Sequence, residues 1–295
     1  MPSLTTISVI IPTYNLSDYI ENTLRSVFCQ TVLPDEIVII DDGSDDDTIL
    51  RIERIYNEAP KGIVRLIRQE RSGPGAARNR GILEAKGNWI SFLDGDDIWL
   101  PDKIEMVKQA IAENPDVVIV THDEYEVDVT GTETLKRLHT YYDAQLPLFS
   151  QLYRRCFLST SCMTVKKDAL IESGGFDKTL PSAQDYDMWL KLARIGNMIF
   201  IPVPLEKYIL RPFSISTDIT KRYNCLMVIA KRYFPHLAHE SGALRAYFYL
   251  YRNILIYKYT AMKMFIYKRE RSRALMTLAC LPFELINNLF AGKKA

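Results

Sequence analysis

Cysteine is scarce in this chain, and its spacing excludes two common structural roles. Five cysteines occur among 295 residues, an odd number, and no two of them form a Cys-x-x-Cys pair. Neither a disulfide framework nor a zinc knuckle is therefore predicted, and a reducing, cytosolic compartment fits this usage best. The sequence also lacks a Gly-x-x-x-x-Gly-Lys phosphate loop, an internal repeat and a low-complexity linker. Nucleotide binding through a P-loop is disfavoured.

Long hydrophobic runs are missing as well. The apolar run near the N-terminus, residues 7–12, has only the length of a strand, and no basic segment precedes it. We therefore expect no export signal. Residues 274–290 are apolar enough to embed shallowly in a membrane surface, but Pro282, Glu284 and two asparagines interrupt them. These interruptions argue against a bilayer span.

Neither sign of charge dominates the whole chain, but each dominates one part. The net charge is +1, yet residues 220–295 hold 14 Lys and Arg against three Asp and Glu, whereas the first 219 residues hold 23 against 33. This asymmetry predicts two surfaces with different partners.

Runs rich in Ile and Val recur in the first half of the chain and predict buried strands, because a sheet covered on both faces needs continuous apolar segments. Helical patterns separate these runs. The first has Ser17 as its expected N-cap and an apolar face from Ile20 to Phe28. The alternation predicts right-handed crossovers and a mostly parallel sheet. The predicted strands are 7–11, 37–40, 63–67, 89–93 and 117–120, and further helices are expected to begin near 45–48, 74–77 and 101.

Beyond residue 121 the rhythm breaks. We expect added mixed strands there, one of them near 160–165, and a helix that carries Tyr186, Trp189, Leu190 and Leu192. From about residue 218 onward the pattern is helical, aromatic and basic. The length suffices for one large α/β domain with a smaller appendage.

Polar segments follow three of the predicted strands, and two of these segments are acidic. The segments 12–15, 41–44 and 94–97 read PTYN, DDGS and DGDD. Ligands bind beyond the carboxyl ends of such strands, and crowded carboxylates repel one another unless a cation lies among them. Oxygen ligands favour Mg²⁺ or Mn²⁺, so a nucleoside diphosphate held through a metal at Asp96 or Asp97 is one interpretation. Turn formation and helix capping are the other, and for 45–47 capping is preferred.

The sequence resembles the family 2 glycosyltransferases in three blocks, which together span residues 7–195. They read ISVIIPTYNLSDYIENTLRSVFCQT with EIVIIDDGSDDDT, then SGPGAARNRGI with GNWISFLDGDDIWLPDKI, and finally GGFDKTLPSAQDYDMWLKLA. The resemblance implies the GT-A fold, which is a Rossmann-like, mixed and mostly parallel sheet flanked by helices, here with a C-terminal helical appendage. It places a catalytic domain at 1–217, with a nucleotide-sugar half at 1–100 and an acceptor half at 101–217, and a helical region at 218–295.

The resemblance also implies roles for individual residues. Asp185 matches the general base, although Gln184 stands where relatives have Glu, and Asp187 is expected to be a solvated helix residue. Arg211 stands where relatives often have His, and we expect it to pair with the departing diphosphate, because Arg cannot bind a cation. The donor contacts are expected from Pro12, Tyr14, Asp42, Arg78, Asn79 and Asp96, and the metal ligands are expected to be Asp96 and Asp97.

The implied activity is inverting, metal-dependent transfer of a sugar from a nucleoside-diphosphate sugar, with UDP favoured, to a hydroxyl of a glycan or lipid-linked glycan, as in bacterial surface polysaccharide synthesis. Mn²⁺ or Mg²⁺ would be the cofactor. Two alternatives stay open at this point. One is a nucleotidyltransferase, which would need a basic, Gly-rich loop that residues 13–18 do not provide. The other is a non-catalytic carbohydrate-binding or scaffold protein with the same fold.

The basic, aromatic region from 218 permits two interpretations. Cations among aromatic side chains are typical of helices at anionic membrane surfaces, which predicts peripheral attachment to the cytoplasmic face of a membrane. The same helices would equally pack on the catalytic domain or join two subunits in a homo-oligomer. No nucleic-acid partner is expected, because no recognition module is present.

Overall fold

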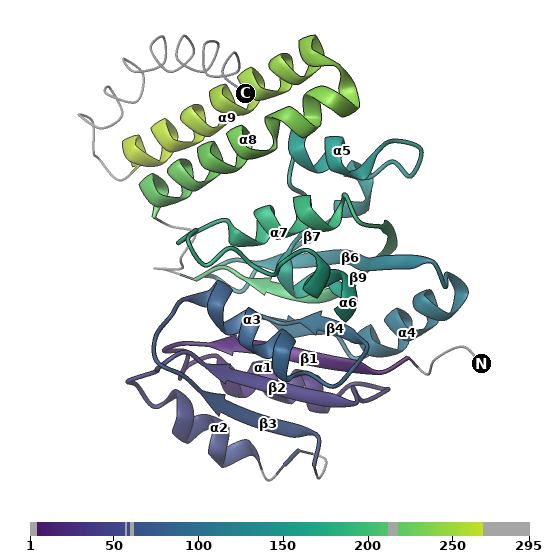
Figure 1. Ribbon diagram of the computed structural model, residues 1–295. Helices are drawn as coiled ribbons and strands as arrows, with labels where there is room; N and C mark the ends of the chain where they lie inside the picture. Colours follow the sequence, from purple (N-terminus) through teal and green to yellow (C-terminus); the bar gives the residue numbers. More distant parts are fainter. Residues whose placement is uncertain (1–4, 57, 60–61, 212–217, 268–295) are drawn as a thin grey trace. The chain divides into compact units, whose positions relative to one another are not determined.

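A computed structural model describes residues 5–56, 58–59, 62–211 and 218–267 (Figure 1). The chain divides into two compact units. The first comprises residues 1–152, 156–180 and 184–211, and the second comprises 153–155, 181–183 and 212–295. Residues 274–290, which the sequence predicts to be apolar enough to embed in a membrane surface, lie outside the described part of the chain.

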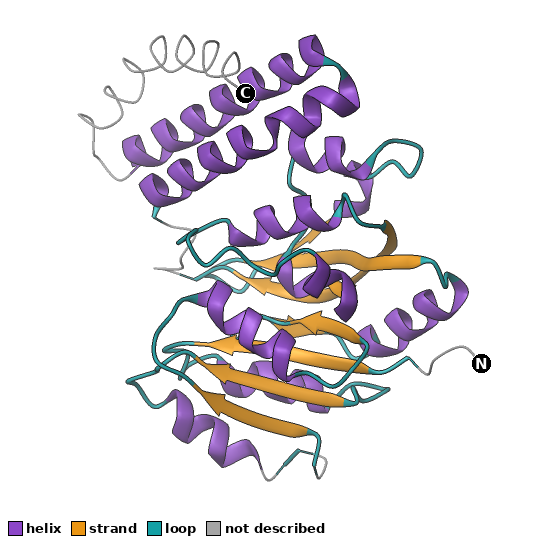
Figure 2. Cartoon of the chain, in the orientation of Figure 1, coloured by secondary structure: helices purple, strands orange, loops and turns teal. Residues whose placement is uncertain are grey.

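The first unit is built on a nine-stranded sheet (Figure 2). Its strands follow the order β3-β2-β1-β4-β8-β6-β9-β5, and β7 pairs with β6. The pairings among β3, β2, β1 and β4 and that of β6 with β9 are parallel, and the others are antiparallel. The mixed sheet expected from the sequence is confirmed. The bounds are β1 Ile7–Thr13, β2 Glu36–Asp41, β3 Val64–Arg68, β4 Trp89–Phe92, β5 Ile98–Trp99, β6 Val117–Val127, β7 Glu133–Lys136, β8 Thr164–Lys166 and β9 Asn197–Ile209.

Helices cover both faces of this sheet, and β1 shows why. Successive side chains of a strand point to opposite faces. Ile7, Val9 and Ile11 pack in one cluster with α1 (Ile20–Phe28), α2 (Thr48–Tyr56) and α4 (Lys103–Glu113). Ile10 faces α3 (Pro74–Glu84) instead, where Gly81 has no side chain to obstruct it. A Cβ atom at Gly81 would lie 2.5 Å from Ile10 Cγ2, so the close approach of α3 to the sheet requires glycine there.

The α3 face of the sheet is extended by an aromatic cluster. The Phe92 ring at the end of β4 lies 5.5 Å from that of Phe176, and Phe176 lies 6.1 Å from Trp189 of α7 (Gln184–Leu192). Both contacts have the edge-to-face geometry that aromatic rings prefer. The remaining short helices are η1 Leu138–Tyr141, α5 Leu148–Arg154, η2 Thr160–Cys162 and α6 Lys167–Glu172.

Two local expectations are wrong. Ser17 does not cap α1, because the helix begins only after Tyr19, which makes no side-chain cap bond; the Ser17 amide donates to Asp46 of the neighbouring loop. The strand expected at 160–165 starts only at Thr164, since residues 160–162 form the short helix η2.

The second unit contains two long helices, α8 (Ile219–Ser241) and α9 (Ala243–Tyr267), joined at Gly242 in the left-handed region (φ 83°). Asp218 caps α8 by accepting from the Lys221 amide at 3.1 Å. Tyr153 connects to both helices: its hydroxyl donates to the Ala230 carbonyl and its own carbonyl accepts from Asn253. None of the described helices has the length and apolar character needed to cross a bilayer.

Candidate active site

Three polar segments meet at one edge of the sheet because β1, β2 and β4 are adjacent and parallel. Tyr14 follows β1, Asp42 follows β2 and Asp94 follows β4 by one residue. The Asp42 amide donates to the Thr13 carbonyl at 2.9 Å, which joins the first two strand ends. Carboxyl edges of this kind are the usual ligand sites of α/β sheets.

Asp42 is buried, and the loop before α3 occupies its carboxylate. One oxygen accepts from Gln69 Nε2 at 2.7 Å and from the Ser72 amide at 2.9 Å, and the other accepts from the Gly73 amide at 2.7 Å. These charge-assisted bonds fix the Gly-rich turn from which α3 starts. The sequence interpretation of Asp42 as a contact of the nucleotide-sugar donor did not anticipate these hydrogen bonds to the loop.

Tyr14 is half-buried and lies beneath an arginine. The guanidinium carbon of Arg71 is 3.3 Å from the centroid of the Tyr14 ring, which is a cation–π contact. Pro12, two residues earlier, is a buried member of β1 paired with Ile40. Its carbonyl oxygen lies 3.2 Å from the place a Cβ on Gly95 would take, so the acidic loop crosses the end of β1 closely.

The acidic loop 94–97 presents its carboxylates at different depths. Asp94 forms an ion pair with Arg78 of α3, and Asp96 forms one with Arg211. Both Asp94 and Asp96 are partly exposed, with side-chain exposures of 30% and 16%. Asp97 is buried: Ser161 Oγ donates to one of its oxygens at 2.6 Å and the Ile209 amide donates to the other at 3.0 Å.

The proximity of these acids is visible in their electrostatics. Burial and then the charge of Asp94 raise the pKa of Asp96, whereas Arg211 opposes that rise. Burial and then the charges of Asp96, Glu206 and Asp94 raise the pKa of Asp97 well above its usual range. Such mutual repulsion would be relieved by a divalent cation at the exposed side of the loop.

Asn79, expected to line the donor pocket, uses both ends of its amide to hold Phe176. Its Nδ2 donates to the Phe176 carbonyl and its Oδ1 accepts from the Phe176 amide, both at 2.8 Å. Arg78 also contacts this residue, because its guanidinium lies 5.5 Å from the Phe176 ring centroid. Asn79 therefore fixes the turn that leads toward α7.

Asp185 lies in the first turn of α7 and is half-buried, with one oxygen accepting from the Tyr186 amide at 2.9 Å. The preceding residue, Gln184, packs against the start of α3: its Cγ is 3.5 Å from the place a Cβ on Gly75 would take. The first turns of α3 and α7 are thus neighbours. Asp187 is not solvated as expected, because it is fully buried and pairs with Lys191 at 2.8 Å.

Three residues of this region carried no role in the sequence interpretation. Asp94 directly follows the predicted strand 89–93, so its position marked it as a site residue, but the sequence interpretation gave the metal role to Asp96 and Asp97. Arg71 and Ser161 gave no signal in the sequence. Arg71 belongs to no motif, and Ser161 lies in a Thr- and Ser-rich stretch where a single serine does not stand out. Ser161 nevertheless binds the acidic loop twice: besides its bond to Asp97, its Oγ accepts from the Asp94 amide at 3.0 Å.

Comparison with known proteins identifies the class of this fold and site. The profile of the family described as Glycosyl transferase family 2 matches residues 8–174, which is more than half of the chain. The chain belongs to this family and is a glycosyltransferase, so the family prediction is confirmed.

Two relatives illustrate the range of similar sequences. An uncharacterized glycosyltransferase of Haemophilus influenzae is 27% identical over 279 residues, which cover 90% of this chain and 91% of that protein. A chondroitin synthase of Escherichia coli is 31% identical over 190 residues, which cover 64% of this chain but only 27% of the synthase. This chain therefore spans about a quarter of the synthase it matches.

Solved structures share the fold. S. aureus TarS in complex with UDP-GlcNAc superposes with a TM-score of 0.67 at 20% identity, over 85% of this chain and 72% of that one. The mannosyltransferase PcManGT from Pyrobaculum calidifontis, in complex with GDP-Man and Mn²⁺, gives a TM-score of 0.65 at 21% identity, over 98% and 89%. The GT-A architecture expected from the sequence is confirmed.

Proposed function

We propose that this glycosyltransferase transfers a sugar, with inversion, from a nucleoside-diphosphate sugar to a hydroxyl of a glycan or lipid-linked glycan in bacterial surface polysaccharide synthesis. The observation that carries the proposal is the meeting of Tyr14, Asp42 and the acidic loop 94–97 at the carboxyl edge of adjacent parallel strands. The bound donors of TarS and PcManGT support a nucleoside-diphosphate sugar, and the name of the chondroitin synthase supports a polysaccharide product. UDP is the nucleotide that the sequence resemblance favours.

A divalent metal fits the exposed side of the acidic loop. Asp94 and Asp96 offer partly exposed oxygen ligands of the kind that Mn²⁺ and Mg²⁺ accept, and the Mn²⁺ of PcManGT is consistent with this use. We propose Asp96 as a ligand with Asp94 beside it. Asp97, the other residue expected to bind the metal, would support the loop from below, because its oxygens accept from Ser161 and Ile209. When bound, the metal would neutralise charge on the leaving diphosphate.

Arg211 and Arg78 supply the fixed positive charge of the site. Each now pairs with a carboxylate of the acidic loop. We propose that donor binding draws Arg211 from Asp96 to the diphosphate, where a guanidinium pairs with two phosphate oxygens in a bidentate fork. Arg78 is buried and would keep Asp94 in place.

Asp185 would take the proton from the acceptor hydroxyl as that oxygen attacks the anomeric carbon opposite the departing diphosphate. Its position at the start of α7, next to the start of α3, supports this assignment. In this scheme the protein forms no covalent intermediate, so one base suffices.

The test separates binding from chemistry. Purified chain is screened against UDP- and GDP-sugars with Mn²⁺ by thermal shift, and the stabilising donor is then used for transfer and for calorimetry. We expect Asp185→Asn to lose transfer by about 10²–10⁴-fold, the usual contribution of a general base, with donor affinity unchanged. Asp168→Asn, an exposed acid in the first turn of α6, is the matched control. Normal transfer by Asp185→Asn would refute the base.

For the second unit we propose peripheral attachment to an anionic membrane surface. Exposed apolar side chains recur along α9 at Leu244, Phe248, Leu255, Tyr259 and Ile266. Vesicle flotation of the full chain with Phe248→Ser and Tyr259→Ser tests this, with Leu83→Ser, an exposed leucine of α3, as control. Loss of binding to anionic vesicles is expected. Unchanged flotation together with a change from dimer to monomer would instead support a subunit interface.

A further inference from the structure

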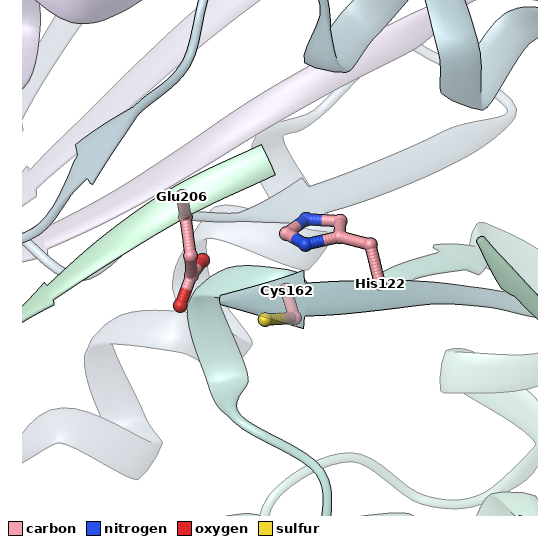
Figure 3. A group of neighbouring side chains, drawn as sticks. All are labelled: His122, Cys162 and Glu206. Atoms are coloured by element: carbon pink, nitrogen blue, oxygen red, sulfur yellow. The ribbon is translucent and has the colours of Figure 1, made fainter. Parts of the chain in front are cut away.

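A buried polar cluster lies beneath the acidic loop, in the first unit. His122 comes from β6, Cys162 ends η2 and Glu206 comes from β9, and their side chains face a common point (Figure 3). One ligand atom from each, a ring nitrogen, the thiol sulfur and a carboxylate oxygen, lies within 4.8 Å of the others. All three residues are fully buried. Polar groups that meet in the interior are normally hydrogen-bonded to one another or bound to a common ion.

The hydrogen bond of His122 determines which ring nitrogen carries the proton. Nδ1 lies 2.7 Å from the carbonyl oxygen of Asp123, and a carbonyl only accepts. Nδ1 must therefore carry the proton, which leaves Nε2 with an unprotonated lone pair. Nε2 is buried and has no hydrogen-bond partner. A backbone carbonyl that holds one ring nitrogen is the arrangement that orients metal-binding histidines.

Glu206 presents a second buried acceptor. Its Oε1 accepts from Ser159 Oγ at 3.3 Å, its Oε2 has no partner within hydrogen-bond geometry, and the acidic groups beside this carboxylate are the Cys162 thiol and Glu124. A buried acceptor without a partner costs roughly 1–3 kcal/mol, so two of them near one another call for a cation or a donor between them.

Cys162 and Glu124 complete the set of donor atoms. The Cys162 sulfur lies 3.5 Å from Glu124 Oε2, so a second carboxylate adjoins the thiol. The Lys103 ammonium is also buried and interacts electrostatically with Glu206 and Cys162. A doubly charged cation together with this ammonium balances one thiolate and two carboxylates. Thiolate, imidazole and carboxylate in combination favour Zn²⁺ over the hard cations that oxygen ligands select.

We propose that His122 Nε2, Cys162 Sγ and a Glu206 oxygen bind Zn²⁺, with Glu124 as the fourth ligand. Zinc distances of about 2.0–2.3 Å require ligand atoms about 3–4 Å apart, so the side chains close in slightly on the ion. The thiol proton of Cys162 leaves to solvent as the Zn–S bond forms. This site is distinct from the exposed metal position at Asp94 and Asp96.

Zinc at this position would hold the acidic loop from beneath. Cys162 follows Ser161, whose hydroxyl binds both Asp94 and Asp97 and whose carbonyl accepts from Trp99 Nε1 at 3.1 Å. Fixing Cys162 therefore fixes the residue on which the loop rests. The role is structural, and it accounts for a polar cluster that takes no part in sugar transfer.

The test measures metal content in the full chain. Protein loaded with Zn²⁺ and dialysed against metal-free buffer is analysed by mass spectrometry of the elements, and Co²⁺ substitution gives a sulfur-to-metal absorption band. We expect about one Zn²⁺ per chain. Cys162→Ser should lower zinc affinity by more than the roughly 10–100-fold that loss of an outer-shell partner costs. Glu206→Gln, which preserves side-chain shape, should do the same and serves if the serine variant fails to fold.

Two controls isolate the site. Cys225→Ser removes another buried cysteine, in α8, and should keep the zinc. Asp96→Asn changes the exposed acidic loop and should keep it too. A wild-type chain that retains no zinc would overturn the proposal. Equal zinc in wild type and in both site variants, or a cobalt form without the sulfur band, would overturn it as well.

Discussion

The hydrogen bonds of Asn79 lead to a prediction that distinguishes two roles for this residue, holding the turn at Phe176 or contacting the nucleotide-sugar donor. Asn79→Ala removes both bonds to the Phe176 backbone, which are 2.8 Å long. Each bond contributes about 0.5–1.5 kcal/mol net, and the abandoned amide and carbonyl of Phe176 are only partly reached by water. We therefore expect a loss of about 2–3 kcal/mol of unfolding free energy, or a Tm lower by roughly 4–10 °C for a chain of this size.

The loss should spread along the aromatic cluster. The Phe176 ring packs against Phe92, Trp189 and Arg78, and a loosened turn at 175–177 relaxes all three contacts. Asn79→Asp gives a second comparison. It keeps an acceptor for the Phe176 amide but turns a carboxylate oxygen toward the Phe176 carbonyl, which also only accepts, so the loss is expected to be at least as large as for Asn79→Ala.

Urea denaturation, followed by tryptophan fluorescence, measures the free energy of unfolding. Calorimetric titration with the nucleotide sugar that stabilises the chain in the thermal-shift screen measures the donor affinity. If Asn79 acts by holding the turn, stability falls while donor affinity changes by less than about threefold, which is under 1 kcal/mol. Unchanged stability with a tenfold or larger loss of donor affinity would refute the reasoning and restore Asn79 as a donor contact.

Three further substitutions test other contacts. Gly81→Ala should cost about 1–3 kcal/mol by pressing its methyl group against Ile10, and a Tm within 1 °C of wild type would contradict that close approach. Asp42→Asn should cost about 2–4 kcal/mol, because an amide nitrogen cannot accept from the loop amides, and should raise proteolysis near residue 72. Lys191→Met should cost about 3 kcal/mol by leaving Asp187 buried without its ammonium; adding Asp187→Asn should recover part of that loss in a double-mutant cycle.

The sequence predicted the first half of the sheet well because burial and apolarity coincide there. In β1 and β2 every residue is buried and nine of the thirteen are apolar, with the polar ones mostly at the strand ends, so the hydrophobic run marks each strand. The acids that follow these strands then fall at one edge by topology alone. The sequence alone therefore places Asp42, Asp94 and Asp96 at one edge, although it does not give the depth at which each carboxylate lies.

The second half of the sheet was predicted less well because several of its buried residues are polar or charged. The run of β6 was expected to end at 120, but the strand continues to Val127 through buried Thr121, His122, Asp123 and Glu124. No apolar pattern marks such residues, since partners from distant segments make their burial tolerable. Asp123, for example, accepts from the His139 amide at 2.9 Å and from its ring.

Hydrogen-bond partners far apart in sequence also explain why the sequence predicted Asp97 only as a metal ligand and missed its buried hydrogen bonds. The two donors to its carboxylate, Ser161 and Ile209, lie 64 and 112 residues away. The second donor precedes Arg211 by two residues, and Arg211 pairs with Asp96. The end of β9 therefore touches two successive acids of one loop, one through its backbone and one through a side chain. Movement of Arg211 toward a diphosphate would leave the backbone bond to Asp97 in place, so the loop can exchange its exposed partner while its buried anchor is kept.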